Sequence, residues 1–219
     1  MKKMFLLLLI AIIAYVVFVL INGDSNTNVS QSIVVINQPQ TNEPINEEDN
    51  RIFKPPLKGA SERVTKKEFG ILITPATSPI QPERFQGYHT GTDFEIFPEE
   101  LNQGVIVQAV CTGNLIKKNE VNGYGGVAVQ ACKFNEEPIT VVYGHLKLSS
   151  INVGPGEEIG SGEIIGSLGA DKSVETGGER KHLHLGIHKG SKVNLLGYVG
   201  SEPELSSWVD PCLYVCYDN

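Results

Sequence analysis

Glycine residues divide the chain from residue 61 to residue 219 into short apolar pieces, and this spacing restricts the possible folds more than any other feature. Residues 105–110 and 139–143 are rich in β-branched side chains, which favour strands. Between Gly154 and Gly169, six glycines separate short apolar pieces. Glycine reaches the positive φ values that tight turns need. No sustained helical period follows the N-terminal segment, so the pattern predicts a mainly β fold, a compact antiparallel β-sheet domain over residues 61–219.

The N-terminus has the pattern of a membrane anchor. Two lysines precede an uninterrupted apolar run from Met4 to Ile21. As a helix this run is about 27 Å long, just enough to cross a hydrocarbon core of about 30 Å. No lysine or arginine follows until Arg51, so the positive-inside rule places the N-terminus in the cytoplasm and the rest of the chain outside. We expect residues 1–22 to form a single transmembrane helix in the cytoplasmic membrane.

A cleaved signal peptide is the alternative for residues 1–22, since its beginning looks similar. The domain would then be secreted. The apolar run is longer than a usual signal core, and no small-residue cleavage pattern follows it closely. These two features favour the uncleaved anchor.

Residues 23–60 are predicted to form a flexible polar stalk. Asn, Gln, Ser, Thr, Pro and Glu dominate this segment, which therefore cannot bury enough apolar surface to offset its ordering entropy. Residues 32–36 are an apolar exception that could form a strand or an adhesive patch. The formal net charge of the whole chain is −7. This charge argues against a nucleic-acid partner, because phosphate binding needs a dense basic face.

The four cysteines suit an oxidising compartment outside the cytoplasm. Cys111 and Cys132 flank a hairpin-like stretch with a turn near residues 121–123, so a bridge between them would join paired strands. Cys212 and Cys216 would have Cα atoms about 13 Å apart in a strand, beyond the limit of about 7 Å, so their bridge needs a turn. Buried free thiols are the alternative. A zinc–thiolate site is less favoured, because no Cys-x-x-Cys pair is present.

Histidines occur in three short motifs that suit a metal site. His182 and His184 share one face of a strand, because side chains alternate, while Leu183, Leu185 and Ile187 share the other. His89 and Asp93 lie close together in a glycine-containing turn, and His145 follows a Tyr-Gly pair. A catalytic zinc site needs three protein ligands and an open position. His89, Asp93 and one histidine of the 182/184 pair can supply them, which leaves the other histidine and His145 beside the metal.

In this order the three motifs resemble peptidase family M23, the lysostaphin/LytM-type zinc endopeptidases. The similarity extends over residues 61–219 and includes Gly-Tyr-Gly-Gly at 123–126 and Trp-Val-Asp-Pro at 208–211. The resemblance implies an active-site groove in which zinc (Zn²⁺) is bound by three residues and two more act on the water and the developing oxyanion. The implied metal ligands are His89, Asp93 and His184, and the implied catalytic residues are His145 and His182. It also implies a substrate: the peptide stems or crosslinks of bacterial cell-wall peptidoglycan.

Several residues depart from the motifs or stand outside them. Lys181 stands where the family usually has proline, and Leu185 where an aromatic residue is common; we expect both to affect the shape of the groove. For Arg84, upstream of the first motif, a position facing the groove is a less favoured possibility. His188 shares the parity of His184 but lies about 13 Å further along a strand. We therefore assign His188 to the surface.

Three alternatives to the enzyme remain open on the sequence alone. His89 and Asp93 could simply stabilise their own turn. A catalytically silent wall-binding or scaffolding module is another possibility, although silent relatives typically lose one of the five positions and all are present here. A structural zinc domain is weaker, because such sites normally have four protein ligands.

Overall fold

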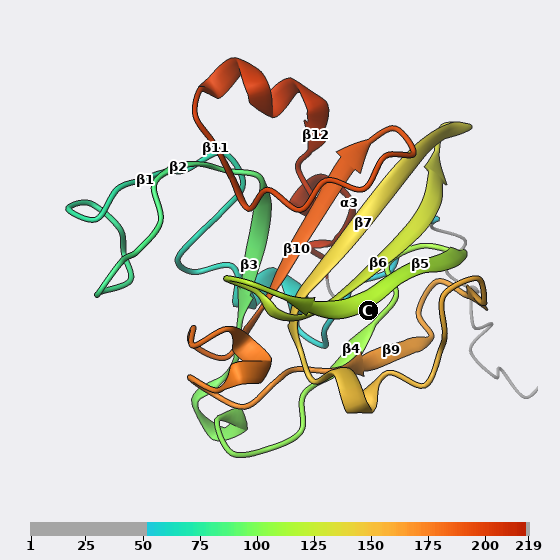
Figure 1. The fold of residues 1–219 in the computed structure, drawn as a ribbon, viewed down its shortest axis with the longest axis horizontal. Helices are drawn as coiled ribbons and strands as arrows, with labels where there is room; N and C mark the ends of the chain where they lie inside the picture. Colours follow the sequence, from blue (N-terminus) through green and yellow to red (C-terminus); the bar gives the residue numbers. More distant parts are fainter. Residues whose placement is uncertain (1–51, 218–219) are drawn as a thin grey trace, which may run out of the picture. The chain divides into compact units, whose positions relative to one another are not determined.

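The computed structural model describes residues 52–217, which form a mainly antiparallel β domain with a few short helices (Figure 1). The largest sheet has the strand order β12-β10-β7-β6-β5-β8, and β3 also pairs with β10. The mainly β prediction is confirmed. Within residues 52–217 no helix is both long and apolar enough to cross a membrane. The expected anchor at residues 1–22 lies outside the described residues.

The elements of the domain are short. The largest sheet contains β3 (Gly91–Glu95), β5 (Gly113–Val121), β6 (Gly125–Phe134), β7 (Glu137–Leu146), β8 (Glu158–Ile159), β10 (His182–Lys189) and β12 (Trp208–Val209). A second sheet contains β1 (Leu72–Ile73), β2 (Gly87–His89) and β11 (Tyr198–Val199). A third sheet contains β4 (Ile106–Gln108) and β9 (Ile164–Ser167). The helices are α2 (Ala60–Arg63) and α3 (Cys212–Val215), with 3₁₀ turns η1 (Pro98–Glu100), η2 (Leu148–Ser150), η3 (Val174–Thr176) and η4 (Glu202–Ser207).

Strand β10 separates the core from the functional face. Leu183, Leu185 and Ile187 belong to the main buried cluster, together with Phe94 of β3 and Tyr143 of β7. His182 and His184, which alternate with Leu183 and Leu185, line a cavity on the opposite face. Apolar burial at roughly 25 cal/mol per Å² therefore holds the strand in one register, and a slip of one residue would move every side chain to the wrong face.

The folded domain begins before residue 61. Phe53, Leu57 and Ala60, which we assigned to the end of the stalk, are buried in the main core. Residues 52–57 contain an Ile, a Phe, two Pro and a Leu, so this part of the segment can bury apolar surface although the polar part before it cannot. The remainder of the expected stalk lies outside the described residues.

The structure contains two disulfides, the favoured Cys111–Cys132 bridge and a Cys212–Cys216 bridge. Strands β5 and β6 form the predicted hairpin, and the Cys111–Cys132 bridge beside it joins Cα atoms 6.4 Å apart. The single-turn helix α3 provides the turn that the Cys212–Cys216 bridge needs, and brings the Cα atoms to 4.6 Å.

We expect removal of the Cys111–Cys132 bridge to lower the free energy of unfolding by about 3 kcal/mol, because the bridge closes a loop of 21 residues in the unfolded chain. For a domain of this size the melting temperature should fall by roughly 10 °C. Thermal unfolding of the double alanine variant under oxidising conditions measures this loss. Double alanine substitution of Cys212 and Cys216 is the control, with a smaller expected loss of about 2 kcal/mol because that loop is short. A larger loss from the control would contradict the expectation.

Candidate metal centre and active site

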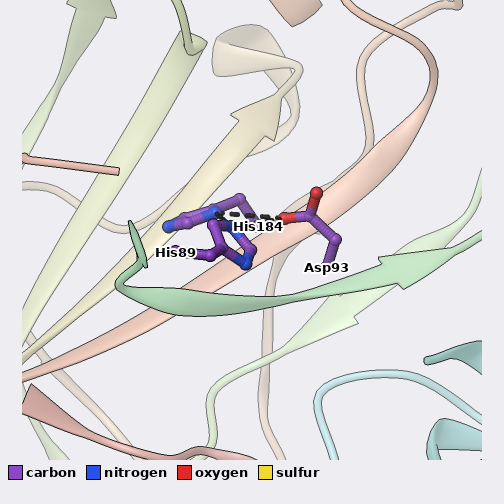
Figure 2. A group of neighbouring side chains, drawn as sticks. All are labelled: His89, Asp93 and His184. Atoms are coloured by element: carbon purple, nitrogen blue, oxygen red, sulfur yellow. Dashed lines mark hydrogen bonds and ion pairs between the residues drawn. The ribbon is translucent and has the colours of Figure 1, made fainter. Parts of the chain in front are cut away.

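His89 and Asp93, four residues apart, and His184, about 90 residues later, converge on one point beside the large sheet (Figure 2). His89 ends β2, and Asp93 lies in β3, which begins at Gly91. His184 lies in β10, where the antiparallel register places it directly opposite Asp93. One possible ligand atom from each residue lies within 4.8 Å of the other two. The tight β2–β3 connection and the β3–β10 register therefore assemble the His89–Asp93–His184 cluster.

The ligand atoms of the cluster face one another. Nε2 of His89 lies 3.0 Å from Nδ1 of His184, and Oδ1 of Asp93 lies 3.1 Å from that Nδ1 and 3.3 Å from His89 Nε2. All three side chains are buried. Nδ1 of His89 also lies 3.1 Å from the carbonyl oxygen of Glu68. An N–H that donates to this carbonyl leaves the Nε2 lone pair of His89 directed at the cluster.

Gly91 is required next to the cluster. A Cβ atom at this position would lie 2.8 Å from both Cε1 and Nε2 of His184 and 2.4 Å from the carbonyl oxygen of Leu185. No real side chain tolerates these distances. The glycine therefore lets β3 approach β10 closely enough for His184 to reach Asp93.

The cluster fits a catalytic zinc ion chemically. Two imidazole nitrogens and one carboxylate oxygen form a known catalytic donor set, which keeps a fourth position open. The cluster borders a cavity, so a ligand could enter from that side. The alternative role for Asp93, stabilising its own turn, does not agree with its contacts. In the part of the chain that the structure describes, its carboxylate contacts three histidines and Arg180, and no backbone N–H.

Arg180 holds the second oxygen of Asp93. The guanidinium donates to Oδ2 at 2.8 Å, and Nε2 of His182 lies 3.3 Å from the same oxygen, which leaves Oδ1 directed at the cluster. Burial alone would raise the pKa of Asp93, but His182 and His89 outweigh it and hold this pKa well below its usual range. Arg180 is fixed in turn by Glu95, which accepts hydrogen bonds from two of its nitrogens. Sequence reasoning missed Arg180, although residues 180, 182 and 184 have the same strand parity.

His145 is arranged as a base. It lies in β7 with φ of +64°, a backbone conformation that is uncommon outside glycine and concentrated at functional sites. Its Nδ1 lies 3.0 Å from the carbonyl oxygen of Thr176, so a proton on Nδ1 is donated there and Nε2 keeps its lone pair. Burial, and next the adjacent His182, hold the pKa of His145 well below its usual range. His145 is therefore neutral.

His182 is arranged as a donor. Its ring centroid lies 4.2 Å from that of His145. Nδ1 faces the carbonyl oxygen of Arg180 at 2.8 Å, and Nε2 faces Oδ2 of Asp93 at 3.3 Å. Both ring nitrogens thus face oxygen atoms that can accept a hydrogen bond. His145 and His182 thus lie side by side outside the cluster. His145 offers a lone pair at Nε2, whereas both ring nitrogens of His182 face oxygen acceptors.

The cluster opens into a cavity of about 290 Å³, at the position of the expected groove. Most of its wall comes from residues 85–86, 122–124, 179–180 and 195–198. Tyr124 packs its ring against His184 and His145, with centroid distances of 5.1 and 5.6 Å. Tyr198 packs against His89, with a centroid distance of 5.2 Å. Two tyrosines therefore bring both apolar rings and hydroxyl groups to the cavity.

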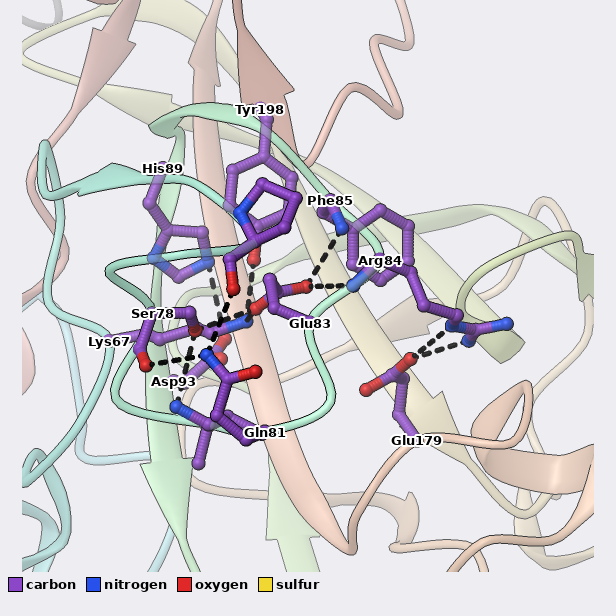
Figure 3. Close-up of polar contacts among 12 residues, drawn as sticks. Lys67, Ser78, Gln81, Glu83, Arg84, Phe85, His89, Asp93, Glu179 and Tyr198 are labelled. Carbon is purple, nitrogen blue, oxygen red and sulfur yellow. Dashed lines mark hydrogen bonds and ion pairs between the residues drawn. The ribbon is translucent and has the colours of Figure 1, made fainter.

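Arg84 lies at the rim of this cavity and not inside it. Its side chain is 56 % exposed and forms an ion pair with Glu179, whereas Glu179 and the neighbouring Phe85 line the cavity (Figure 3). Arg84 also donates to the carbonyl oxygen of Gly177 at 3.2 Å. Arg84 thus links its own segment to residues 177–179 at the rim of the cavity.

Two expectations about neighbouring residues are corrected. Lys181 and Leu185 do not shape the groove, because odd-numbered positions of this segment point away from it. Leu185 is in the core, and the Lys181 ammonium donates to the carbonyl oxygens of Glu100 and Leu101. His188, which we assigned to the surface, is half-buried and packs edge-on against the Trp208 ring with a centroid distance of 4.8 Å.

The η3 loop, whose Thr176 carbonyl oxygen contacts His145, approaches β6 closely at Gly125. Gly125 has φ of +69°, and a Cβ atom there would lie 2.1 Å from the carbonyl oxygen of Glu175. Any side chain at position 125 must push the η3 loop, and with it the Thr176 carbonyl, away from the sheet. The orientation of His145 therefore depends on this close approach.

We expect Gly125→Ala to lower kcat/KM by about 100-fold without loss of metal, because a shift of about 1 Å in a catalytic group can have this effect. The measurement is kcat/KM on the wall peptides that the family resemblance implies, together with metal stoichiometry. Gly178→Ala is the matched control, because Gly178 also has positive φ, +82°, but nothing lies within 4 Å of the added Cβ. Equal losses in the two variants would assign the effect to backbone strain and contradict the role of the loop.

Comparisons with known proteins give one family match. A family model described as peptidase family M23 matches residues 87–195. No curated protein matches the chain. The catalytic domain of the antimicrobial peptidase lysostaphin from Staphylococcus simulans is 21 % identical over 70 % of this chain and 93 % of its own, with a TM-score of 0.47. LytU is 23 % identical over 69 % of this chain and 83 % of its own, also with a TM-score of 0.47.

A third solved structure, described as a SpoIIIAH and SpoIIQ complex, is 18 % identical over 73 % of this chain and 97 % of its own, with a TM-score of 0.48. All three TM-scores are below 0.5.

Proposed function

Because the chain belongs to peptidase family M23 through residues 87–195, we propose that it is a zinc-dependent endopeptidase that hydrolyses peptide bonds of bacterial peptidoglycan. Membership of the family supports a peptidase, and a function of the peptidoglycan-hydrolase kind. The zinc dependence, the roles of the five residues and the peptide substrate are the proposal. The observation that supports it most directly is the convergence of His89, Asp93 and His184 beside a cavity that His145 and His182 also line.

The proposed metal ligands are His89 through Nε2, Asp93 through Oδ1 and His184 through Nδ1. When bound, zinc acts as a Lewis acid and brings the pKa of water toward about 7. Arg180 keeps Oδ2 of Asp93 engaged, so that the carboxylate presents a single oxygen to the ion. Glu68 keeps the His89 ring oriented through its carbonyl oxygen.

The two remaining histidines divide the proton chemistry. Neutral His145 accepts a proton from the attacking water at Nε2 and then delivers it to the amine of the leaving peptide. The Nε2–H of His182 donates a hydrogen bond to the oxyanion that develops on the substrate carbonyl, in exchange for its long 3.3 Å contact with Oδ2 of Asp93. Both roles agree with the hydrogen bonds that each Nδ1 makes, because these fix the ring orientations before substrate arrives.

The proposed location follows from the N-terminal segment. Residues 1–22 anchor the chain in the cytoplasmic membrane, and the catalytic domain lies outside it, where peptidoglycan is found. Membrane fractionation of the chain with and without residues 1–22 tests this anchor. We expect the full chain in the membrane fraction and the truncated chain in the soluble fraction. Retention of the truncated form in the membrane would contradict the assignment.

Metal analysis and a digestion assay on the purified full chain test the enzyme. We expect about one zinc ion per chain, and release of new amino groups from peptidoglycan that a chelator stops and added zinc restores. Mass spectrometry of fragments from walls of several crosslink types then identifies the bond. Zinc bound without cleavage of any wall type would favour the second candidate, a silent wall-binding or scaffolding module.

A further inference from the structure

We propose that the hydroxyl group of Tyr198 donates a hydrogen bond to the carbonyl oxygen of the peptide bond being cleaved, and that Lys67 holds it in place for this role. The inference rests on the proposed function, because it adds a residue to the same site. It concerns a tyrosine at the start of a two-residue strand that none of the sequence motifs includes.

Tyr198 is fixed beside the cluster by its strand pairing. In β11 it lies directly opposite His89 of β2, so the two side chains share one side of this small sheet. Phe85 stacks on the Tyr198 ring with a centroid distance of 5.5 Å and an interplanar angle of 15°. The ring thus contacts both Phe85 and His89, and it lines the same cavity as Asp93 and His182. Its hydroxyl cannot move far without disturbing these contacts.

The hydroxyl of Tyr198 has a proton available for the cavity. Lys67 Nζ lies 3.0 Å from the phenolic oxygen. An ammonium group has only donors, so the tyrosine oxygen must be the acceptor in this contact. Among residues 52–217, no group accepts the phenolic proton in return. The O–H bond is therefore free to donate to a molecule that enters the cavity.

Lys67 is held so that it supports the tyrosine and does not compete for substrate (Figure 3). Its ammonium is 2.5 Å from Oε2 of Glu83, and the two side chains are only 3 % and 2 % exposed. Ser78 donates to the same Oε2, while the backbone N–H groups of Arg84 and Phe85 donate to Oε1. Glu83 thus accepts four donors and neutralises the lysine. A hydrogen bond from a charged donor polarises the hydroxyl and strengthens its own O–H as a donor.

Tyr124 is the natural alternative donor, since its ring also lines the cavity. The two tyrosines differ in the contacts of their hydroxyl groups, since Lys67 donates to that of Tyr198. No cation contacts its hydroxyl in the described part of the chain, and its ring packs against His145 and His184. We assign Tyr124 to the wall of the cavity and Tyr198 to the substrate carbonyl.

The test is Tyr198→Phe in the full-length, zinc-loaded protein, with three measurements: zinc stoichiometry, steady-state kinetics on a wall peptide, and the dissociation constant of a phosphinate dipeptide. The phosphinate is a stable tetrahedral anion that resembles the transition state and can be measured without turnover. We expect unchanged zinc, an almost unchanged KM, and a kcat lowered by about 100-fold. The affinity for the phosphinate should fall by at least tenfold.

Tyr214→Phe is the matched control, because that ring packs against Phe53 and Phe134 in the core and does not line the cavity. It should leave kcat and phosphinate affinity unchanged. The inference is overturned if Tyr198→Phe keeps the wild-type kcat and phosphinate affinity, or if Tyr124→Phe causes the loss instead. If the wild type cleaves no wall type but binds the phosphinate, and Tyr198→Phe weakens this binding, the role of Tyr198 stands and the proposed function fails.

Discussion

Alanine at position 184 should abolish zinc binding and activity together. His184 supplies one of the three ligand atoms, and its Nδ1 lies within 3.1 Å of atoms from both other ligands, so its removal leaves two donors for the ion. Loss of a ligand from a three-ligand site leaves too few donors to hold zinc. We expect less than one tenth of the wild-type zinc after dialysis and no detectable release of wall peptides.

Alanine at position 145, in contrast, should keep the zinc and lower kcat by about 10²–10⁴-fold, the range for loss of a general base. His145 is bound through Nδ1 to the Thr176 carbonyl and contributes no atom to the cluster. His188→Ala is a useful control for both variants, because it removes a partly buried histidine that packs on Trp208 away from the cavity. Equal zinc loss in the His145 and His184 variants would overturn the assignment of roles.

The second large effect concerns stability. Glu83→Gln should lower the free energy of unfolding by about 3–5 kcal/mol, because it leaves the charge of Lys67 buried without its partner. Both side chains are almost fully buried, with the ammonium and carboxylate in direct contact. Chemical denaturation at neutral pH measures the loss. The double variant Lys67→Met/Glu83→Gln is the control: it removes both charges and should recover most of the stability. A double variant as unstable as the single one would contradict this explanation.

The same ion pair predicts a direction for the effect of pH. Burial would raise the pKa of Glu83, but the hydrogen bonds from Lys67, the Phe85 N–H and Ser78 outweigh it and lower this pKa below its usual value. A lowered pKa in the folded state means that the stabilisation is complete above the unfolded-state pKa of glutamate. It disappears as pH falls through the lower pKa of the folded state. The difference in stability between wild type and Glu83→Gln should therefore shrink in acid.

Local patterns in the sequence were sufficient to predict the class of fold and most of the candidate site. The alternation around His182 and His184 predicts which residues face the core and which face the cavity, and the structure agrees. The same alternation, applied to Lys181 and Leu185, would have placed both away from the groove. Applied to position 180, it would have identified Arg180. The parity of the strand, and not the resemblance to the family, decides on which side these three residues lie.

The sequence by itself determined the β class, the hairpin with its neighbouring disulfide, and the residue types able to bind zinc, because these depend on side-chain alternation, glycine turns and local spacing. Only the tertiary structure decided which groups meet. The β3–β10 register sets His184, and not His182, opposite Asp93. The contact between Lys67 and Tyr198 joins residues 131 positions apart, a separation over which no local pattern of the chain carries information. Long-range pairing of strands determines such contacts, since each register is chosen by burial of the whole apolar face.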